Sequence, residues 1–211
     1  MKLKKIASLM LAGIMAVSML AACNGKTEEP SSSSSETPAT GVSATFANFL
    51  SGKRVEFKDN ATYAGYLADG LKDADPKSAN MNSITSVVPM AAGWNVFDKV
   101  ETKFDKNELE YTGDETIDKF DSAIAQANDE LFIAMYAAPG SVKQDVVLEA
   151  VAADLNTEFG DGFMVNYADV SGKRYDYDYT GSVSMQKVED GSSSAWYVLV
   201  TLHIDATEVK A

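Results

Sequence analysis

The sequence predicts an α+β fold over residues 45–211, in which helices pack on a mainly antiparallel sheet as a two-layer sandwich. Two observations lead to this class. Apolar residues recur at helical spacing between residues 60 and 158, and segments of strand-like alternation, separated by turn residues, follow from residue 163. No Pro/Gly-rich break divides residues 45–211, so one domain is expected.

The first third of this domain predicts a strand and a helix. Residues 54–58 are expected to form a short strand. A helix is expected over residues 60–73, where four apolar residues have helical spacing: Tyr63, Tyr66, Leu67 and Leu71. Residues 80–110 contain two further stripes of this kind, but Pro89 interrupts the first. Because proline ends or kinks a helix, the structure of residues 80–110 stays open.

The middle of the domain predicts helix, strand and helix. Thr112 and Glu115 have the spacing of a capping box, which predicts a helix over residues 113–128. The dense apolar run over residues 130–136 predicts a buried strand. A second capping box, at residues 141–144, precedes another apolar stripe and predicts a helix over residues 141–158.

The C-terminal part predicts three strands, over residues 163–170, 174–188 and 195–206. Turn residues separate them: Ser171-Gly172 after the first strand, and Asp190-Gly-Ser-Ser193 after the second. Because short connections join neighbouring antiparallel strands, a three-stranded meander is expected.

The first 23 residues have the composition of a targeting signal. Three lysines within the first five residues precede an uncharged run from Ile6 to Ala22, which ends in Leu-Ala-Ala-Cys23. This ending resembles the lipobox of bacterial lipoprotein precursors. The resemblance implies that residues 1–22 are a signal peptide and that Cys23 becomes the mature N-terminus, carrying a thioether-linked diacylglyceryl group. Such a group would anchor the protein to the extracytoplasmic side of the cell membrane.

Residues 23–44 predict a tether between the lipid and the domain. They include five consecutive serines, flanked by prolines and glutamates, and contain almost no apolar side chain. A segment of this composition cannot bury enough apolar surface to offset its ordering entropy, so disorder is expected. A flexible chain of this length has a root-mean-square span of about 25 Å.

Composition excludes several kinds of site. Removal of the three signal-peptide lysines from 18 basic residues leaves 15 against 31 acidic residues, a formal charge of −16. Such a surface argues against nucleic-acid binding, which depends on lysine and arginine neutralising phosphates. Cys23 is the only cysteine and His203 the only histidine, so a zinc site of the usual kind lacks ligands. No cofactor is expected, because no nucleotide-binding glycine motif is present.

Two short patterns contain residue types that occur in catalytic sites. His203 shares a strand face with Thr201 and Asp205, but the chain has no Gly-x-Ser-x-Gly motif to supply a nucleophile. Ser184 and Lys187 match Ser-x-x-Lys, yet on a strand they point to opposite faces. We expect a hydrogen-bonded or solvated histidine and a chance match, respectively. No acidic cluster has the spacing of a calcium-binding loop.

Three alternating tyrosines are the candidate binding residues. On a strand, Tyr175, Tyr177 and Tyr179 lie on one face, and Asp176 and Asp178 lie on the other. Such a row of tyrosines can stack on sugars or cover a partner, or it can supply cross-strand packing on a half-buried sheet. Both interpretations stay open.

The leading hypothesis is a non-catalytic binding or interaction module, held at the cell envelope by its lipid, whose ligand or protein partner is unknown. Enzyme activity stays an open question, and the sequence favours its absence. The alternatives are an extracytoplasmic hydrolase of envelope polymers and a structural accessory subunit of a membrane complex.

The lipobox generates a first prediction. Cys23→Ser removes the acceptor of the diacylglyceryl group, so the protein should be released or stay unprocessed, because two acyl chains hold a protein on a bilayer. Fractionation and electrophoretic mobility measure this. A mutant that stays in the detergent-extracted membrane fraction with unchanged mobility would contradict it.

Overall fold

The strands of this protein form one mixed sheet. The computed structural model describes residues 36–38, 41–50, 54–108, 110–116, 127–158 and 164–210. The strands are β1 (Glu36–Pro38), β2 (Val55–Asn60), β3 (Val88–Met90), β4 (Tyr111–Thr116), β5 (Glu130–Pro139), β6 (Tyr167–Val170), β7 (Lys173–Asp190) and β8 (Ser193–Glu208). Their order is β1-β2-β7-β8-β5-β3, with β4 also beside β5 and β6 beside β7.

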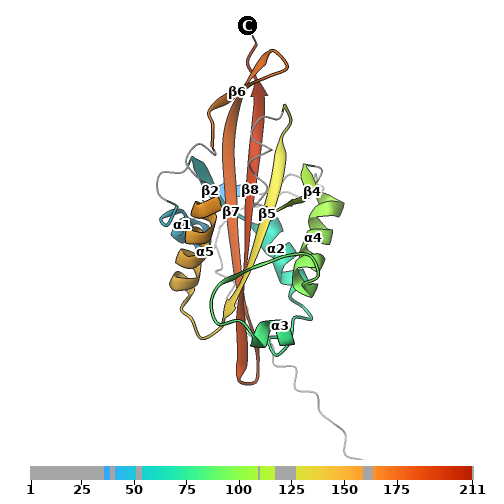
Figure 1. Ribbon diagram of the computed structural model, residues 1–211, viewed down its shortest axis with the longest axis vertical. Helices are drawn as coiled ribbons and strands as arrows, with labels where there is room; N and C mark the ends of the chain where they lie inside the picture. Colours follow the sequence, from blue (N-terminus) through green and yellow to red (C-terminus); the bar gives the residue numbers. More distant parts are fainter. Residues whose placement is uncertain are drawn as a thin grey trace, which may run out of the picture. The chain divides into compact units, whose positions relative to one another are not determined.

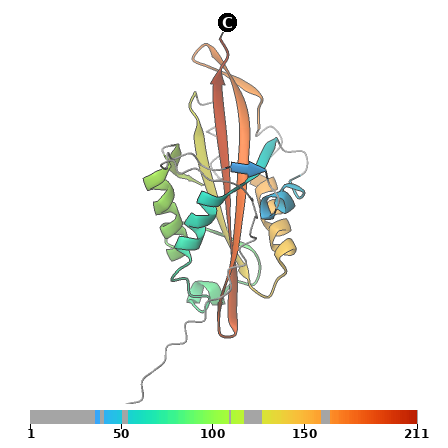
Figure 2. The same cartoon turned by 180° about the vertical axis from the view of Figure 1, so that it is seen from behind.

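Helices lie on both faces of this sheet (Figures 1 and 2). They are α1 (Val42–Ala47), α2 (Ala61–Gly70), α3 (Ala79–Asn82), α4 (Asn95–Asn107) and α5 (Gln144–Glu158). The side chains of α1 and α5 join one apolar cluster, and those of α2, α3 and α4 join another. We call the sheet face toward α1 and α5 the first face, and the other the second face.

The central strand β8 sends apolar side chains to both faces. It pairs antiparallel with β5 from Pro139↔Ala195 to Glu130↔Ile204, and with β7 along nearly its whole length. Val198, Val200 and Leu202 enter the first cluster, whereas Tyr197 and Leu199 enter the second. Because successive side chains of a strand alternate, both faces need a cover. The predicted α+β class is confirmed, with a helical layer on each side of the sheet instead of on one.

Most of the predicted elements are confirmed. The strand over residues 54–58 is β2, the helix over residues 60–73 is α2, and the buried strand over residues 130–136 is β5. The predicted helix over residues 141–158 is α5, although it begins at Gln144, so Ser141 precedes the helix. The C-terminal meander is β6, β7 and β8, paired antiparallel in that order.

The predicted helix over residues 113–128 is wrong in its described part. Residues 111–116 form β4, which pairs parallel with β5 at Tyr111↔Leu131 and Thr116↔Ile133, and residues 117–126 lie outside the described residues. A capping box is a local signal, and pairing with a strand distant in the chain overrides it. Residues 80–110 form α3, β3 and α4, and Pro89 lies in the short edge strand β3, where proline is tolerated.

The ordered domain begins earlier than the predicted boundary at residue 45. Both β1 and α1 start within residues 23–44, the segment predicted to be a disordered tether. The rest of that segment lies largely outside the described residues. Tertiary contacts explain the difference. β1 pairs antiparallel with β2, and Ser43 in α1 is fully buried against β7.

Both predicted turns are two-residue hairpin loops. Ser171 and Gly172, which connect β6 to β7, have positive φ angles of 53° and 81°. Two positive φ angles are typical of a type I′ turn, whose twist matches that of the flanking strands. Gly191, with φ of 63°, begins the loop from β7 to β8.

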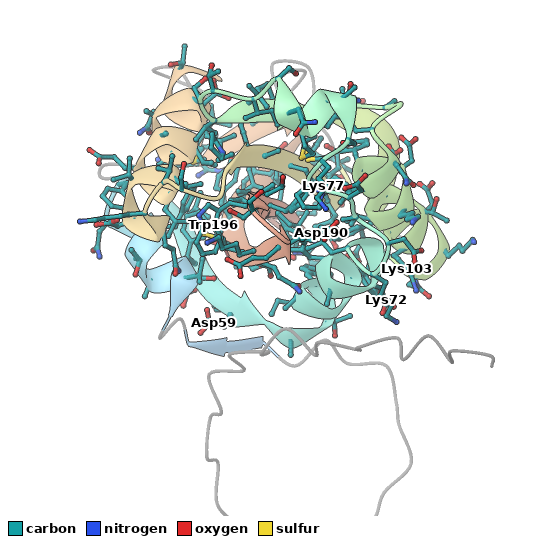
Figure 3. All side chains as sticks on the ribbon, turned by 90° about the horizontal axis from the view of Figure 1, so that it is seen from below. Asp59, Lys72, Lys77, Lys103, Asp190 and Trp196 are labelled. Atoms are coloured by element: carbon teal, nitrogen blue, oxygen red, sulfur yellow. The ribbon has the colours of Figure 1, made fainter. Side chains whose placement is uncertain are left out.

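Ion pairs connect the helices and loops of the second face, and Figure 3 labels Lys72, Lys77, Lys103 and Asp190 among their members. Asp69 of α2 contacts Lys72 at 2.6 Å and Lys103 of α4 at 2.9 Å. These two hydrogen-bonded lysines lower the pKa of Asp69 to about 2. Lys77 contacts Asp190 at the β7–β8 turn, at 2.7 Å. The loop after α2 is thereby joined to the end of the hairpin.

The hydroxyl of Ser43 occupies part of the outer edge of β7. Its Oγ accepts a hydrogen bond from the Val183 N–H at 3.0 Å and donates one to the Val183 carbonyl at 3.2 Å. Both bonds are buried, so one side chain replaces the neighbouring strand that the edge lacks at this point. A buried backbone group without a partner is costly, and Ser43 removes that cost.

Ser43→Ala is therefore expected to lower the free energy of unfolding by about 1–3 kcal/mol, because it leaves buried backbone groups of Val183 unsatisfied. Thr45→Ala is the matched control, since Thr45 lies in the same helix and is exposed, and should change stability by less than about 0.5 kcal/mol. Chemical denaturation of both variants measures this. Equal stabilities would mean that water replaces the hydroxyl.

Candidate functional site

The three candidate tyrosines lie on one face of β7 and are buried there. Only 8% of Tyr175, 6% of Tyr177 and 4% of Tyr179 is exposed, whereas Asp176 and Asp178 on the opposite face are exposed. The predicted alternation is confirmed, but the exposed row of tyrosines as a binding surface is wrong. The three rings belong to the apolar cluster beneath α1 and α5, so they pack the sheet instead of presenting a surface.

Burial also changes the acidity of two of these phenols. It raises the pKa of Tyr179 to about 12, and it raises the pKa of Tyr177. The hydroxyl of Tyr179 donates a hydrogen bond to the Val165 carbonyl at 3.0 Å, which gives its polar end a partner inside the protein. These groups are therefore protonated structural side chains at neutral pH.

A small polar pocket lies on the second face, beyond the end of the apolar cluster. Its volume is about 90 Å³. β2, α2, β7, β8 and the segment that follows α4 all contribute to its lining, which consists of Lys58, Asn60, Tyr63, Glu108, Glu110, Thr180, Gly181, Ser182, Thr201 and His203. We call this the sheet pocket. Neither Lys58 nor the two glutamates had been recognised as site residues, because they are distant from His203 in the sequence.

The wall formed by β2 and α2 depends on two local features. Asn60 ends β2 and caps α2, because its side-chain oxygen accepts hydrogen bonds from the N–H groups of Thr62 and Tyr63. Gly181 lets β2 approach β7 closely, since a Cβ at this position would lie 2.8 Å from the ring of Phe57. Together they bring Lys58 and Asn60 to the edge of the pocket.

Two hydroxyls in the floor of the pocket are bonded to each other. Ser182 and Thr201 face each other across β7 and β8, and their side-chain oxygens lie 2.8 Å apart. The Thr201 hydroxyl oxygen also accepts the Ser182 N–H at 3.2 Å. Both residues are almost fully buried. This pair therefore satisfies buried polar groups and is not arranged as a nucleophile with a base.

His203 lies between two carboxylates. Its Nε2 is 3.3 Å from an Oε of Glu110, and its Nδ1 is 3.4 Å from an Oδ of Asp205. The Nε2 contact is close, but its geometry is not that of a hydrogen bond. A quarter of the His203 side chain is exposed. The predicted shared face of Thr201, His203 and Asp205 is confirmed, and the imidazole lies in the pocket wall between the carboxylates of Glu110 and Asp205.

The second glutamate of the pocket is also engaged. An Oε of Glu108 accepts a hydrogen bond from the hydroxyl of Tyr66 in α2 at 2.7 Å. Burial, followed by the bond to Glu108, raises the pKa of Tyr66 to about 12. Glu108 therefore joins the end of α4 to α2 and holds that wall of the pocket in place.

The remaining sequence candidates have structural surroundings. Ser184 and Lys187 lie on a strand, with Ser184 buried and the Lys187 ammonium 5.6 Å from the centre of the Trp196 ring. They therefore lack the helical geometry that their motif requires. Cys23 lies outside the described residues. Within those residues, no group of three or more His, Cys, Asp or Glu side chains is placed to hold a metal ion, and no helix is long and apolar enough to span a membrane.

Comparisons with known proteins add no family assignment. Neither a protein-family model, nor a curated protein, nor a solved structure matches this chain.

The buried tyrosines generate a prediction about alkaline pH. Because the pKa of Tyr179 is about 12 in the folded protein and ordinarily 10.0, its contribution to stability is complete below pH 10. That contribution is lost as the pH rises towards 12. In an ultraviolet titration of tyrosinate, Tyr179→Phe should remove absorbance change near pH 12. Loss of absorbance change near pH 10 instead would mean that Tyr179 is exposed to solvent.

Proposed function

We propose that this protein is a cell-envelope lipoprotein, anchored through Cys23, whose α+β domain is a non-catalytic binding module. The sheet pocket is its binding site. One observation carries the proposal. The groups in the pocket that could perform chemistry do not form a nucleophile with a base: the Ser182 hydroxyl is bonded to that of Thr201, and the His203 ring nitrogens lie 3.3 Å and 3.4 Å from carboxylates of Glu110 and Asp205. The pocket thus offers polar contacts of both charges and no activated nucleophile.

The size of the pocket supports binding of one small polar group. A volume of about 90 Å³ holds a few water molecules, whereas pockets for drug-sized ligands have volumes of about 300–1,000 Å³. An enzyme that cleaves an envelope polymer needs a cleft for several units of its substrate. We therefore infer that the ligand is a small polar solute, or a single polar group of a larger partner.

A hydrolase is the second candidate, because the pocket contains carboxylates. Glu108 and Glu110 both line it, and paired carboxylates can act as acid and base in glycoside hydrolysis. One of the pair, Glu108, is bound to the Tyr66 hydroxyl, and the other lies against His203. These contacts favour a role in shaping the pocket. The third hypothesis, a structural accessory subunit of a membrane complex, does not require a binding pocket.

Thermal denaturation of the full-length lipoprotein in detergent tests the proposal. The probes are free amino acids, monosaccharides, short glycans and small dicarboxylates, each added at millimolar concentration. At least one class should raise the melting temperature, because a ligand that binds only the folded state stabilises it by mass action. Thr180→Trp, which fills the pocket from β7, should abolish that shift. Thr207→Trp, an exposed position on β8 outside the pocket lining, is the matched control and should retain it.

Two outcomes would contradict the proposal. Time-dependent cleavage of a glycan in the same mixtures, detected by chromatography and lost in Glu110→Gln, would establish the hydrolase instead. No shift with any probe, in wild type and variants alike, would remove the sheet pocket as a binding site.

A further inference from the structure

Among the described strands, none pairs with the outer edge of β7 over its last third. β6 and β2 pair with this edge as far as Gly181, and the Ser43 hydroxyl bonds to Val183. Within the described part of the chain, no strand pairs with the edge beyond that point. Because backbone groups alternate in direction, the N–H and C=O groups of Met185, Lys187 and Glu189 point outward, like those of Val183.

The two strands that end the sheet order, β1 and β3, are poor acceptors of a further strand. β1 contains Pro38 and β3 contains Pro89, and proline has no N–H to donate to a neighbouring strand. Both strands are also only three residues long. Natural sheets blunt their edges with such devices, and an edge without them can accept a strand from another chain. The end of β7, which contains no proline, is such an edge.

The side chains along this edge select one partner. Lys187 and Glu189 lie on the same face of β7 and contact each other at 2.7 Å. Charged residues on an edge repel strands of unsuitable charge. A second copy of the same edge, however, is complementary to them. In an antiparallel arrangement about a two-fold axis at Val188, each Lys187 lies opposite the Glu189 of the second copy.

The same register suits the opposite face of β7. Val188 lies opposite the Val188 of the second copy, so two partly buried apolar side chains pack on each other at the two-fold axis. On either side, the Gln186 amide lies opposite the Asp190 carboxylate of the second copy and can donate a hydrogen bond to it. A register centred one residue earlier would place Lys187 opposite Lys187 and is disfavoured by like charge.

We propose that two copies of this chain associate by antiparallel pairing of their β7 edges, centred on Val188. The dimer joins two sheets into one continuous sheet through the hairpin ends. Residues 186–190 of each copy pair, which provides about four backbone hydrogen bonds. Such a short contact makes a weak dimer in solution, and a shared membrane surface would strengthen it. The proposal itself does not depend on the lipid anchor or the sheet pocket.

Cysteine cross-linking of the full-length protein tests the register. Val188→Cys places two thiols directly opposite each other, in a cross-strand pair close enough for a disulfide, so mild oxidation should give a covalent dimer on a non-reducing gel. Gln186→Cys is the matched control, because this position is exposed on the same face but lies opposite residue 190. It should give no more dimer than wild type, whose Cys23 sets the background. A mixture of Gln186→Cys and Asp190→Cys should cross-link.

Charge exchange tests the selectivity in the Val188→Cys background. Lys187→Glu or Glu189→Lys alone places like charges opposite each other and should reduce the covalent dimer about ten-fold. The double exchange should restore it. Equal cross-linking by Val188→Cys and Gln186→Cys, or a double exchange no better than either single one, would overturn the proposal. Melting temperatures of all variants identify any that fail to fold. A failure here leaves the pocket test unchanged, since that test measures ligand binding by the folded chain.

Discussion

The structure depends on one constraint, the need to bury both faces of β8. This strand is the centre of the sheet, with β7 along one side and β5 along the other. Its apolar side chains alternate between the two faces, and the tyrosines of β7 and the apolar residues of β5 extend both surfaces. A sheet that is apolar on both faces requires a helical layer on each. That requirement places α1 and α5 on the first face of the sheet and α2, α3 and α4 on the second face.

The sheet pocket lies where this pattern ends on the second face. Tyr197 and Leu199 are covered by the helices, but the next side chains along that face are Thr201 and His203. The β7 residues that pair with them, Ser182 and Thr180, are also polar. A polar patch on an otherwise apolar sheet needs partners, and the buried hydroxyls find them in each other. The pocket is therefore a consequence of the strand register combined with the place where α2 begins.

Edges are the second problem that this sheet solves. Proline limits β1 and β3, and the Ser43 hydroxyl satisfies the edge of β7 in the middle of the domain. Each device prevents an exposed row of hydrogen-bonding groups from recruiting other chains. The edge of β7 next to the β7–β8 loop contains no proline, and its protection comes from the charged side chains of Lys187 and Glu189. Proline disfavours pairing with any further strand, whereas charged side chains disfavour only strands whose charges do not complement them.

The sequence by itself determined the elements with strong local signals. Periodic apolar residues located α2, α5 and the three C-terminal strands, and turn residues located both hairpin loops. It also placed the three tyrosines on one face of β7, and Thr201, His203 and Asp205 on one face of β8, because a strand alternates strictly. Only the tertiary structure decided which of those faces is covered. Burial of the tyrosines depends on α1 and α5, and residues 111–116 form a strand because β5 lies beside them. The glutamates around His203 come from a distant segment. These outcomes depend on contacts between residues far apart in the chain, and no local pattern reports such contacts.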